Sequence, residues 1–318
     1  MIKVGFIGAG DISLLHNEGV KQTEDAELIG IWNRTREKAV SKSKLFGCKV
    51  FDTVEELINS VDVVYILTNM ETHHQYARQA IDAGKHVLIE KPTAVTVEEI
   101  EDLKMSADKM NVHVAPVHNY IYEPSITRAK DLIESGKIGD LVSLYILYNI
   151  HHPESVAARY PGVIRQILTH HAYCTLYLSG QPEKVSCMKA TINDGSVPQE
   201  NIAMVTMIMK NHSLSHLCAS FASDDHAGDP WTFMIKVIGT KGATRYSYRD
   251  WVENTPAVVH SQTYSAYPYT IKTMGKHFLE EVINKGEKPL STLDDAITCM
   301  KIIEACEKSV KEGKHISL

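Results

Sequence analysis

The sequence predicts two domains, a doubly wound α/β domain followed by an α+β domain. Its 318 residues fit two domains of roughly 150 residues each. Strand-length apolar runs alternate with helical patterns up to about residue 120, and long strand-like runs with few helices between them follow. We therefore expect domains at 1–120 and 121–318, with a ligand-binding cleft where they meet.

Strands and helices alternate regularly in the first domain. Strands are expected at residues 2–7, 26–32, 49–51, 61–67, 86–90 and 112–117, and helices at 12–22, 35–46, 53–59, 72–83 and 96–110. The strands are apolar throughout rather than at every second residue, which indicates a parallel sheet covered on both faces.

The second domain combines helices with longer strands. Helices are expected at 125–135, 163–178, 271–284 and 294–311, and strands at 141–149, 184–192, 203–210, 214–222, 232–238 and 243–248. The glycine-bracketed segment 239–242 is a hairpin signal, so the sheet should be mostly antiparallel. Both alternating faces of strand 203–209 are largely apolar. One face is therefore either covered within the chain or, as we favour, an interface between subunits.

The composition excludes several classes of protein. Lys and Arg number 33 against 39 Asp and Glu, so no basic excess points to nucleic acid or to an anionic membrane. No apolar run approaches the roughly 18 residues of a membrane helix. The sequence opens on an apolar strand without a signal segment, and its six cysteines contain no C-x-x-C pair. We expect a cytoplasmic protein with reduced thiols and no zinc site.

The first turn carries a dinucleotide fingerprint. Gly8-Ala9-Gly10-Asp11-Ile12-Ser13 is G-x-G-x-x-G with serine in the third position, between a strand and a helix. The first glycine allows a tight turn, the second lets backbone approach a pyrophosphate, and the helix N-terminus favours the anion. We expect Gly8, Gly10, Asp11 and Ile12 to line a pyrophosphate; the alternative is a merely structural glycine turn.

The end of the second strand bears on the choice between NAD and NADP. An NAD enzyme usually places a carboxylate there, but Asn33, Arg34 and Arg36 stand in this segment instead. Guanidinium groups suit a 2′-phosphate, so we favour NADP(H) over NAD(H). The alternative is that both arginines are solvated residues at a helix start.

Glu90-Lys91-Pro92 follows the strand at 86–89. Ligands bind beyond the carboxyl ends of strands in a doubly wound sheet, so Lys91 is placed to reach a nicotinamide and to stabilise alkoxide charge on a substrate. A surface lysine before a turn-forming proline is the alternative. His118 and Asn119 end another strand of this sheet and are candidate substrate contacts.

A longer pattern resembles the glucose–fructose oxidoreductase / inositol dehydrogenase (Gfo/Idh/MocA) family. The resemblance rests on Asp62-Val63-Val64, Thr68-Asn69, His73, Ala77 and the run from Ala83 to Pro92, and continues through Asn119, Pro124, 136–139, 239–242 and 295–313. It implies a Rossmann domain and a C-terminal domain with an open-faced sheet, often used for dimer or tetramer contacts. It also implies an NAD(P) cofactor flanked on the nicotinamide side by Thr68, Asn69, His73 and Glu90.

The resemblance implies two catalytic residues. Lys91 would contact cofactor and substrate, and His170 would act as the acid/base within the family pattern D-x-x-x-H-x-x-D. Gln166 and Tyr173 stand where the family most often has the two aspartates. Without a carboxylate one turn away, His170 lacks a charge that would raise its basicity. Gln166 and Tyr173 remain able to hydrogen-bond a sugar hydroxyl.

The segment before the His170 helix supplies further candidate substrate contacts, His152 and Arg159, with ordinary loop residues as the alternative. Adjacent histidines such as His151 and His152 diverge on a strand or a helix, so no metal site is expected.

Together these patterns predict an NAD(P)-dependent oxidoreductase. It would transfer a hydride between nicotinamide and a hydroxyl-bearing carbon of a sugar, cyclic polyol or related small polyhydroxylated substrate. The alternative is a cofactor-binding regulator or sensor of the same fold, suggested by Gln166 and Tyr173 and opposed by the retention of Lys91 and His170. A metal-dependent hydrolase lacks the necessary ligand geometry.

Overall fold

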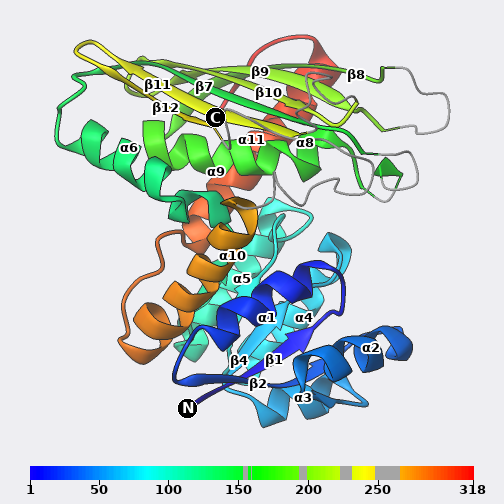
Figure 1. Ribbon diagram of the computed structural model, residues 1–318. Helices are drawn as coiled ribbons and strands as arrows, with labels where there is room; N and C mark the ends of the chain where they lie inside the picture. Colours follow the sequence, from blue (N-terminus) through cyan, green and yellow to red (C-terminus); the bar gives the residue numbers. More distant parts are fainter. Residues whose placement is uncertain (153–156, 159, 193–198, 223–230, 248–265) are drawn as a thin grey trace. The chain divides into compact units, whose positions relative to one another are not determined.

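The computed structural model describes residues 1–152, 157–158, 160–192, 199–222, 231–247 and 266–318 (Figure 1). The chain forms two compact units. The first comprises Met1–Asn119 and Pro268–Ile297, and the second comprises Tyr120–Tyr267 and Thr298–Leu318. The sequence-based division placed residues 268–297 in the second domain, whereas the structure places them in the first unit.

The first unit is built on a six-stranded parallel sheet. Its strand order is β3-β2-β1-β4-β5-β6, with β1 Ile2–Ile7, β2 Ala26–Trp32, β3 Lys49–Val50, β4 Val63–Ile66, β5 His86–Ile89 and β6 Val114–Pro116. The chain runs outward from β1 in one direction and from β4 in the other, which confirms the doubly wound prediction. All four residues of β4 are fully buried, as continuously apolar strands require.

Helices cover the parallel sheet on both faces. They are α1 Ile12–Lys21, α2 Arg36–Phe46, α3 Val54–Ser60, α4 His73–Asp82 and α5 Val97–Met110, joined by α10 Ala266–His277, which continues as a π-helix at Phe278–Asn284. Thr53 and Thr96 cap α3 and α5 by accepting hydrogen bonds from the N–H groups of Glu56 and Glu99.

Helix α10 packs closely against α1. A Cβ added to Gly19 would lie 3.2 Å from the carbonyl oxygen of Lys272, so a larger residue at position 19 would press on the backbone of α10. This close approach explains why the segment 268–297 belongs to the first unit.

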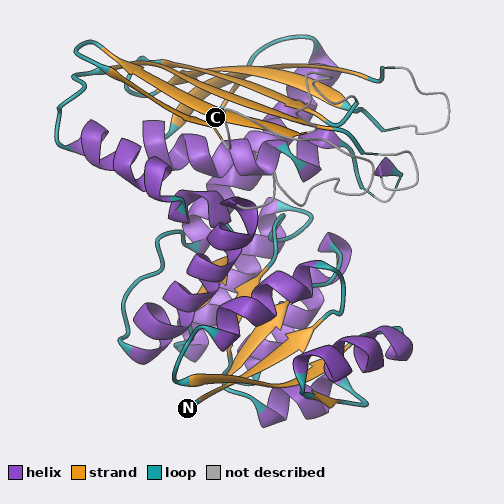
Figure 2. Ribbon diagram, in the orientation of Figure 1, coloured by secondary structure: helices purple, strands orange, loops and turns teal. Residues whose placement is uncertain are grey.

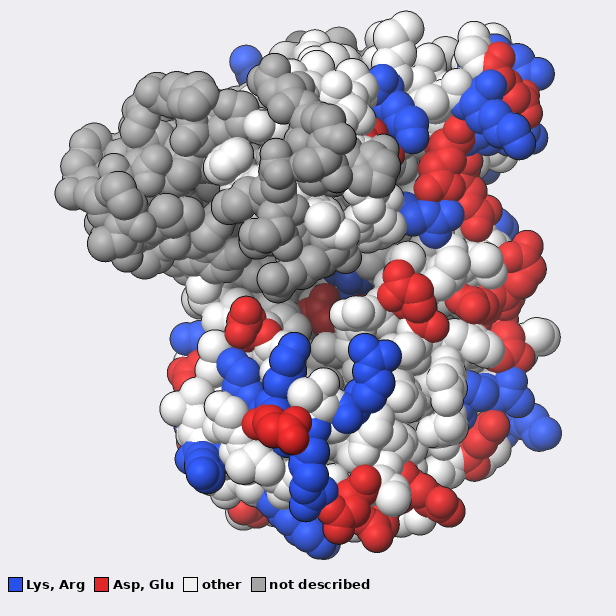
Figure 3. All heavy atoms as spheres, turned by 90° about the vertical axis from the view of Figure 1, so that its right-hand side faces the viewer, with Lys and Arg blue, Asp and Glu red and all other residues white. Residues whose placement is uncertain are grey.

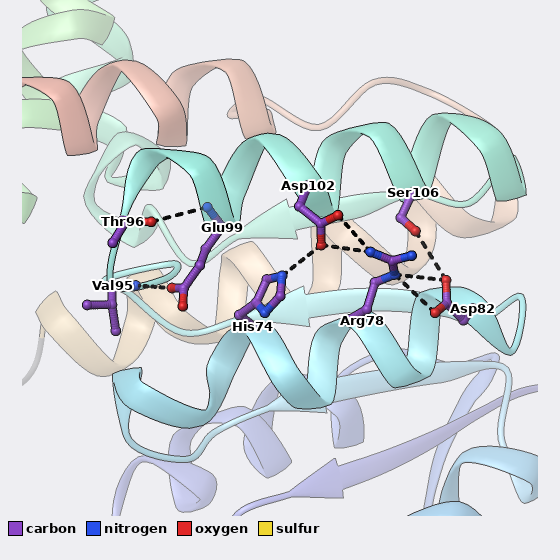
Figure 4. A network of polar contacts seen from close by, with 8 residues as sticks. All are labelled: His74, Arg78, Asp82, Val95, Thr96, Glu99, Asp102 and Ser106. Carbon is purple, nitrogen blue, oxygen red and sulfur yellow. Dashed lines mark hydrogen bonds and ion pairs between the residues drawn. The ribbon is translucent and has the colours of Figure 1, made fainter.

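A polar network joins α4 to α5 in the first unit (Figure 4). Arg78 Nη1 donates to both carboxylate oxygens of Asp102 at 2.7 and 2.8 Å, while Arg78 Nε donates to Asp82 at 3.0 Å. His74 Nε2 lies 2.7 Å from Asp102, and Ser106 Oγ donates to Asp82 at 3.1 Å. These contacts fix α4 and α5, the helices that flank β5 along the chain.

The second unit contains a seven-stranded sheet in the order β12-β11-β7-β10-β9-β8-β13. The strands are β7 Leu141–Ile150, β8 Pro182–Ala190, β9 Ile202–Met209, β10 Leu214–Ser220, β11 Trp231–Gly239, β12 Ala243–Ser247 and β13 Ile316–Ser317. Among the described strands of this sheet, β7 and β10 pair in parallel and the other neighbours pair antiparallel, so the mostly antiparallel prediction is confirmed. The expected hairpin joins β11 and β12, with Gly239 N–H donating to Gly242 O at 2.8 Å.

Helices lie along one face of this sheet (Figure 2). They are α6 Pro124–Glu134, α8 Val163–Gln166, α9 Leu168–Ser179 and the greater part of α11 Leu293–Glu312. The helix expected at 163–178 is divided at Ile167, which ends α8 and precedes α9.

The other face of the sheet carries exposed apolar side chains. Met188 is 78% exposed, Met204 47% and Leu214 49%, whereas Ala203, Val205, Met207 and Met209 of β9 are buried toward the helices. The two apolar faces of β9 thus have different surroundings, and no described helix covers the exposed one. None of the described helices combines the length and apolar character needed to span a membrane.

Candidate active site

The turn after β1 has the geometry of a nucleotide-binding turn. Gly8 has φ +119°, and a Cβ there would lie 2.6 Å from the backbone of Leu67, so only glycine fits. A Cβ on Gly10 would meet nothing within 4 Å, which leaves the backbone open to an approaching group. Ser13 is buried, and its hydroxyl donates to Gly10 O at 2.6 Å. The third fingerprint position therefore ties the turn to the first turn of α1.

Asn33 connects the end of β2 to this turn. Its Oδ1 accepts from the N–H of Ala9 at 3.0 Å, and its Nδ2 donates to Thr35 O at 2.9 Å. Both ends of the Asn33 amide are thereby engaged in holding the two loops together.

Several cationic side chains lie on α2 or just before it. Arg34 is exposed, and Arg36 forms an ion pair with Asp52 in which both side chains are more than half exposed. Lys42, whose side chain is only 17% exposed, places Nζ 3.6 Å from Oδ1 of Asp11 in the nucleotide turn. Figure 3 shows Lys and Arg side chains on the side of the first unit where Figure 1 draws α2. No carboxylate stands among residues 33–36 to hold a ribose 2′-hydroxyl.

Lys91 follows β5 and has a perturbed ammonium group. Burial lowers the pKa of Lys91 to about 8, and the neighbouring Glu90 carboxylate opposes this shift. Burial would raise the pKa of Glu90, but a hydrogen bond and charge from His16, together with the charge and N–H of Lys91, outweigh it and hold that pKa below its usual value. A carboxylate and an ammonium are thus adjacent at the carboxyl end of the sheet.

His73 ties together the loops that follow β4 and β5. Its Nδ1 lies 2.8 Å from Pro92 O, and its Nε2 lies 3.0 Å from Thr68 O. Burial lowers the pKa of His73, although the two carbonyls and the charges of Glu90 and Glu71 favour the protonated ring. A neutral ring has one N–H, so it donates to one of these carbonyls at a time.

His118 and Asn119 are both buried and contact the segment 268–297. His118 Nδ1 lies 2.6 Å from Ser291 Oγ, and Asn119 Nδ2 donates to Thr270 Oγ1 at 2.7 Å. These bonds anchor the end of β6 to the loop before α11 and to α10.

His170 lies in the second unit, on α9, in an aromatic setting. Its Nδ1 is 2.8 Å from the hydroxyl of Tyr173, which also accepts from the N–H of Tyr120 at 3.3 Å. The rings of Tyr120 and Tyr148 have centroids 5.0 and 6.3 Å from that of His170. Burial raises the pKa of Tyr173 well above its usual value, so its phenol stays protonated.

Two other expected contacts belong to the same unit. Gln166 is the last residue of α8 and is half-buried. The N–H of His152 donates to Phe221 O at 3.2 Å, and its ring lies beside Tyr160 and Phe221. Arg159 lies outside the described residues. Within the described part of the chain, no cluster of three His, Cys, Asp or Glu could hold a metal ion.

Comparison with known proteins identifies the family. Residues 2–118 match the oxidoreductase family with an NAD-binding Rossmann fold, and residues 126–245 match the GFO/IDH/MocA C-terminal domain. The chain belongs to the Gfo/Idh/MocA family. The resemblance inferred from the sequence is thereby confirmed.

Relatives within the Gfo/Idh/MocA family carry names of sugar and inositol dehydrogenases. The chain is 33% identical over 159 residues to glucose-6-phosphate 3-dehydrogenase of Bacillus subtilis (strain 168), which covers 50% of this chain and 44% of that protein. It is 22% identical over 331 residues to inositol 2-dehydrogenase of Rhizobium meliloti (strain 1021), covering 100% of this chain and 99% of that one. In the matches to glucose-6-phosphate 3-dehydrogenase and to a Bacillus subtilis scyllo-inositol 2-dehydrogenase, the chain spans about half of the relative's length, 44% and 54%.

A solved structure shows the same fold. Scyllo-inositol dehydrogenase from Lactobacillus casei, with bound NAD(H) and scyllo-inositol, matches with a TM-score of 0.85 at 18% identity, covering 100% of this chain and 99% of that chain.

The expected Gfo/Idh/MocA site residues fall into two sets. The first unit holds Gly8, Gly10, Asp11, Ile12, Asn33, Arg34, Arg36, Thr68, Asn69, His73, Glu90, Lys91, His118 and Asn119. The second unit holds His152, Gln166, His170 and Tyr173. Within each set, the structure joins Asn33 to the nucleotide turn, His73 to Thr68, and His170 to Tyr173.

Three residues that contact members of these sets were missed by sequence reasoning: His16 beside Glu90, Lys42 beside Asp11 and Tyr120 beside Tyr173. His16 lies on the buried side of α1 with Ser13 and Val20. This helical spacing indicated that His16 is buried, but not which residue it contacts. Lys42 and Tyr120 gave no such signal, because their contacts join segments far apart in the chain.

Proposed function

We propose that this Gfo/Idh/MocA protein is an NAD(P)-dependent oxidoreductase acting on a hydroxyl-bearing carbon of a sugar, cyclic polyol or related polyhydroxylated molecule. The observation that carries the proposal is the ammonium of Lys91, with its lowered pKa, beside the Glu90 carboxylate at the carboxyl end of β5. The names of the relatives support the substrate class.

The residues of the first unit fit a dinucleotide. Gly8 makes a turn that only glycine allows, Gly10 leaves space for a pyrophosphate, and Ile12 begins α1, whose first turn holds no acidic residue. The nicotinamide supplies hydride exchange with the substrate carbon when the cofactor is bound. Thr68, Asn69, His73 and Glu90 would border it.

In this proposal Lys91 and His170 have separate roles in the reaction. Lys91 donates a hydrogen bond to the substrate oxygen and stabilises its developing negative charge. His170 takes the hydroxyl proton during oxidation and returns it during reduction. Gln166, Asn119, His118, His152 and Arg159 are proposed to position the other hydroxyl groups.

NADP(H) is the proposed preferred cofactor. Arg34 is exposed at the end of β2, and no carboxylate stands there to bind a 2′-hydroxyl. The pairing of Arg36 with Asp52 weakens the contribution of Arg36, because a phosphate would have to compete with that carboxylate.

A regulator or sensor of the same fold is the second candidate. It is favoured by Tyr173, whose phenol stands where the Gfo/Idh/MocA pattern most often has an aspartate, next to His170. Such a protein would bind the cofactor without turning over a substrate.

The exposed apolar face of the second sheet is proposed as a contact between subunits in a homodimer or homotetramer. Met188, Met204 and Leu214 would lose their contact with water there.

A cytoplasmic location is also proposed. It is supported by the six cysteines, all of which are described and none of which forms a disulfide.

The decisive experiment has two steps. Fluorescence titration with NADPH and NADH measures cofactor binding, and a panel of inositols, aldoses and ketoses then measures turnover with the cofactor that binds. Turnover of any panel member supports the oxidoreductase, binding without turnover supports the sensor, and no binding of either cofactor contradicts both.

A further inference from the structure

His16 is buried, and the proposed reaction assigns it no role. It lies on α1, four residues after Ile12, and its Nε2 is 2.9 Å from Oε1 of Glu90. Both side chains are buried, and 74 positions separate them in the chain. The pair therefore joins the helix of the nucleotide turn to the residue that precedes Lys91.

Each oxygen of Glu90 has its own donor. Oε1 contacts His16, and Oε2 accepts from the backbone N–H of Lys91 at 3.0 Å. A carboxylate only accepts hydrogen bonds, so Nε2 of His16 carries a proton and donates it to Oε1 of Glu90. His16 Nδ1 is also buried and makes no hydrogen bond to any described residue. The only polar partner that the described structure gives the His16 ring is thus Glu90.

The other surroundings of the pair are mostly apolar. The ring of Tyr65 on β4 packs edge-on against His16 with centroids 5.6 Å apart, and Tyr65 itself stacks on Phe6. The charges that act on Glu90 are those of His16 and Lys91, and the Glu90 charge in turn acts on His73 of α4. On α1 and α10, Glu18 and Lys272 approach each other at 3.8 Å and are partly exposed.

We propose that His16 is a positioning residue for Lys91: by donating to Glu90 it keeps that buried group ionised, and the ionised carboxylate keeps Lys91 protonated. The proposal rests on the proposed function for its effect on turnover, but the link among the three residues stands without it. The Glu-Lys pair alone would leave one buried carboxylate oxygen without a donor.

The physical argument follows from desolvation. A buried carboxyl group that loses one of two donors takes up a proton more readily, so removing His16 raises the pKa of Glu90. Lys91 then loses a nearby negative charge while its burial remains, and its pKa falls below about 8. At neutral pH a larger fraction of Lys91 is an amine, which no longer stabilises negative charge on a substrate oxygen.

The test compares His16→Ala with His16→Gln, because the side-chain amide of glutamine can place an N–H donor where Nε2 of His16 lies. The reactivity of Lys91 toward acetic anhydride, measured by mass spectrometry from pH 6 to 10, reports its pKa without substrate. We expect the midpoint to fall by about one pH unit in His16→Ala and to return to that of the wild type in His16→Gln. His86→Ala, at the amino end of β5, is the control and should leave the midpoint in place.

Activity provides the second readout. The alkaline limb of kcat/KM should move to lower pH by the same amount in His16→Ala and be restored in His16→Gln. An unchanged labelling midpoint in folded His16→Ala overturns the proposal, whatever happens to turnover. A shifted midpoint in a protein that turns over no substrate would instead contradict the proposed function and leave the link intact. If His16→Ala does not fold, a wild-type midpoint in Glu90→Gln overturns the proposal equally, since the same charge is removed.

Discussion

The hydroxyl of Tyr173 lies 2.8 Å from Nδ1 of His170, one helical turn away on α9. The same hydroxyl accepts from Tyr120 N–H, and burial keeps the phenol protonated by raising its pKa. A phenol orients the imidazole as an aspartate would, but it brings no negative charge to stabilise an imidazolium. The aromatic partner thus preserves the geometry of a histidine dyad and removes its charge.

This relationship predicts different effects of two substitutions at position 173. Tyr173→Asp places a carboxylate beside Nδ1 and should raise the pKa of His170, moving the acid limb of the oxidation rate upward by about one pH unit. Tyr173→Phe removes the hydrogen bond without adding charge, so kcat should fall roughly tenfold or more while the limb stays in place. The pH profiles of kcat/KM check both. A limb that does not move in a folded Tyr173→Asp protein would contradict the role of His170.

Lys91→Ala should cut turnover by about 10² or more and leave cofactor binding mostly intact. The ammonium stabilises charge that develops only as the substrate oxygen loses its proton, so its removal acts on kcat more than on the ground state. Steady-state rates and cofactor titration measure the two effects. Lys109→Ala, exposed on the last turn of α5, is the matched control. Near-normal turnover in Lys91→Ala would remove Lys91 from the mechanism.

Arg34→Ala and Lys42→Ala test the basis of cofactor choice. If Arg34 meets the 2′-phosphate, its removal should weaken NADPH binding about tenfold and leave NADH binding unchanged, because NADH lacks that phosphate. Lys42 lies beside Asp11 in the nucleotide turn. Its removal leaves the negative charge of Asp11 without a neighbouring cation near the expected pyrophosphate, so the binding of both cofactors should weaken. Titrations at fixed ionic strength separate the two patterns, with Lys21→Ala at the far end of α1 as the control. Equal losses for both cofactors in Arg34→Ala would argue against a phosphate contact.

The α/β alternation was predictable because burial on both faces makes each strand of a parallel sheet apolar throughout, as in β4. The fingerprint was equally recognisable, because its glycines and serine stand within the six consecutive residues 8–13, although the backbone clash that requires Gly8 involves the distant Leu67. Both signals lie within a few residues of the chain or in a repeated pattern.

Long-range partnerships were not predictable. The helical pattern at 271–284 showed an apolar face but not that α10 would pack on Gly19 of α1. The break at Ile167 left no composition signal, because apolar residues continue on both sides of it. His16 and Glu90 are joined by a hydrogen bond across 74 positions, and a single sequence does not encode such a pairing in its periodicity.

Buried histidines should make the fold sensitive to acid. Burial lowers the pKa of His118 and of His171 to about 3, whereas both take up protons near pH 6.5 once unfolded. The unfolded chain therefore binds more protons between these values, and stability is lost as pH falls below about 6.5. Each group contributes up to ~1.4 kcal/mol per pH unit in that window.

His171→Leu should flatten this dependence. His171 is fully buried and neither ring nitrogen makes a hydrogen bond to a described residue, so an apolar side chain removes the titration without breaking a described hydrogen bond, although the ring contact with Tyr148 is lost. We expect the loss of unfolding free energy between pH 7 and 5, measured with urea, to be smaller in His171→Leu than in the wild type. His315→Gln, exposed near the end of the chain, should keep the wild-type slope. Equal slopes in His171→Leu and the wild type would mean that His171 is protonated inside the folded protein, and that its burial does not hold it neutral.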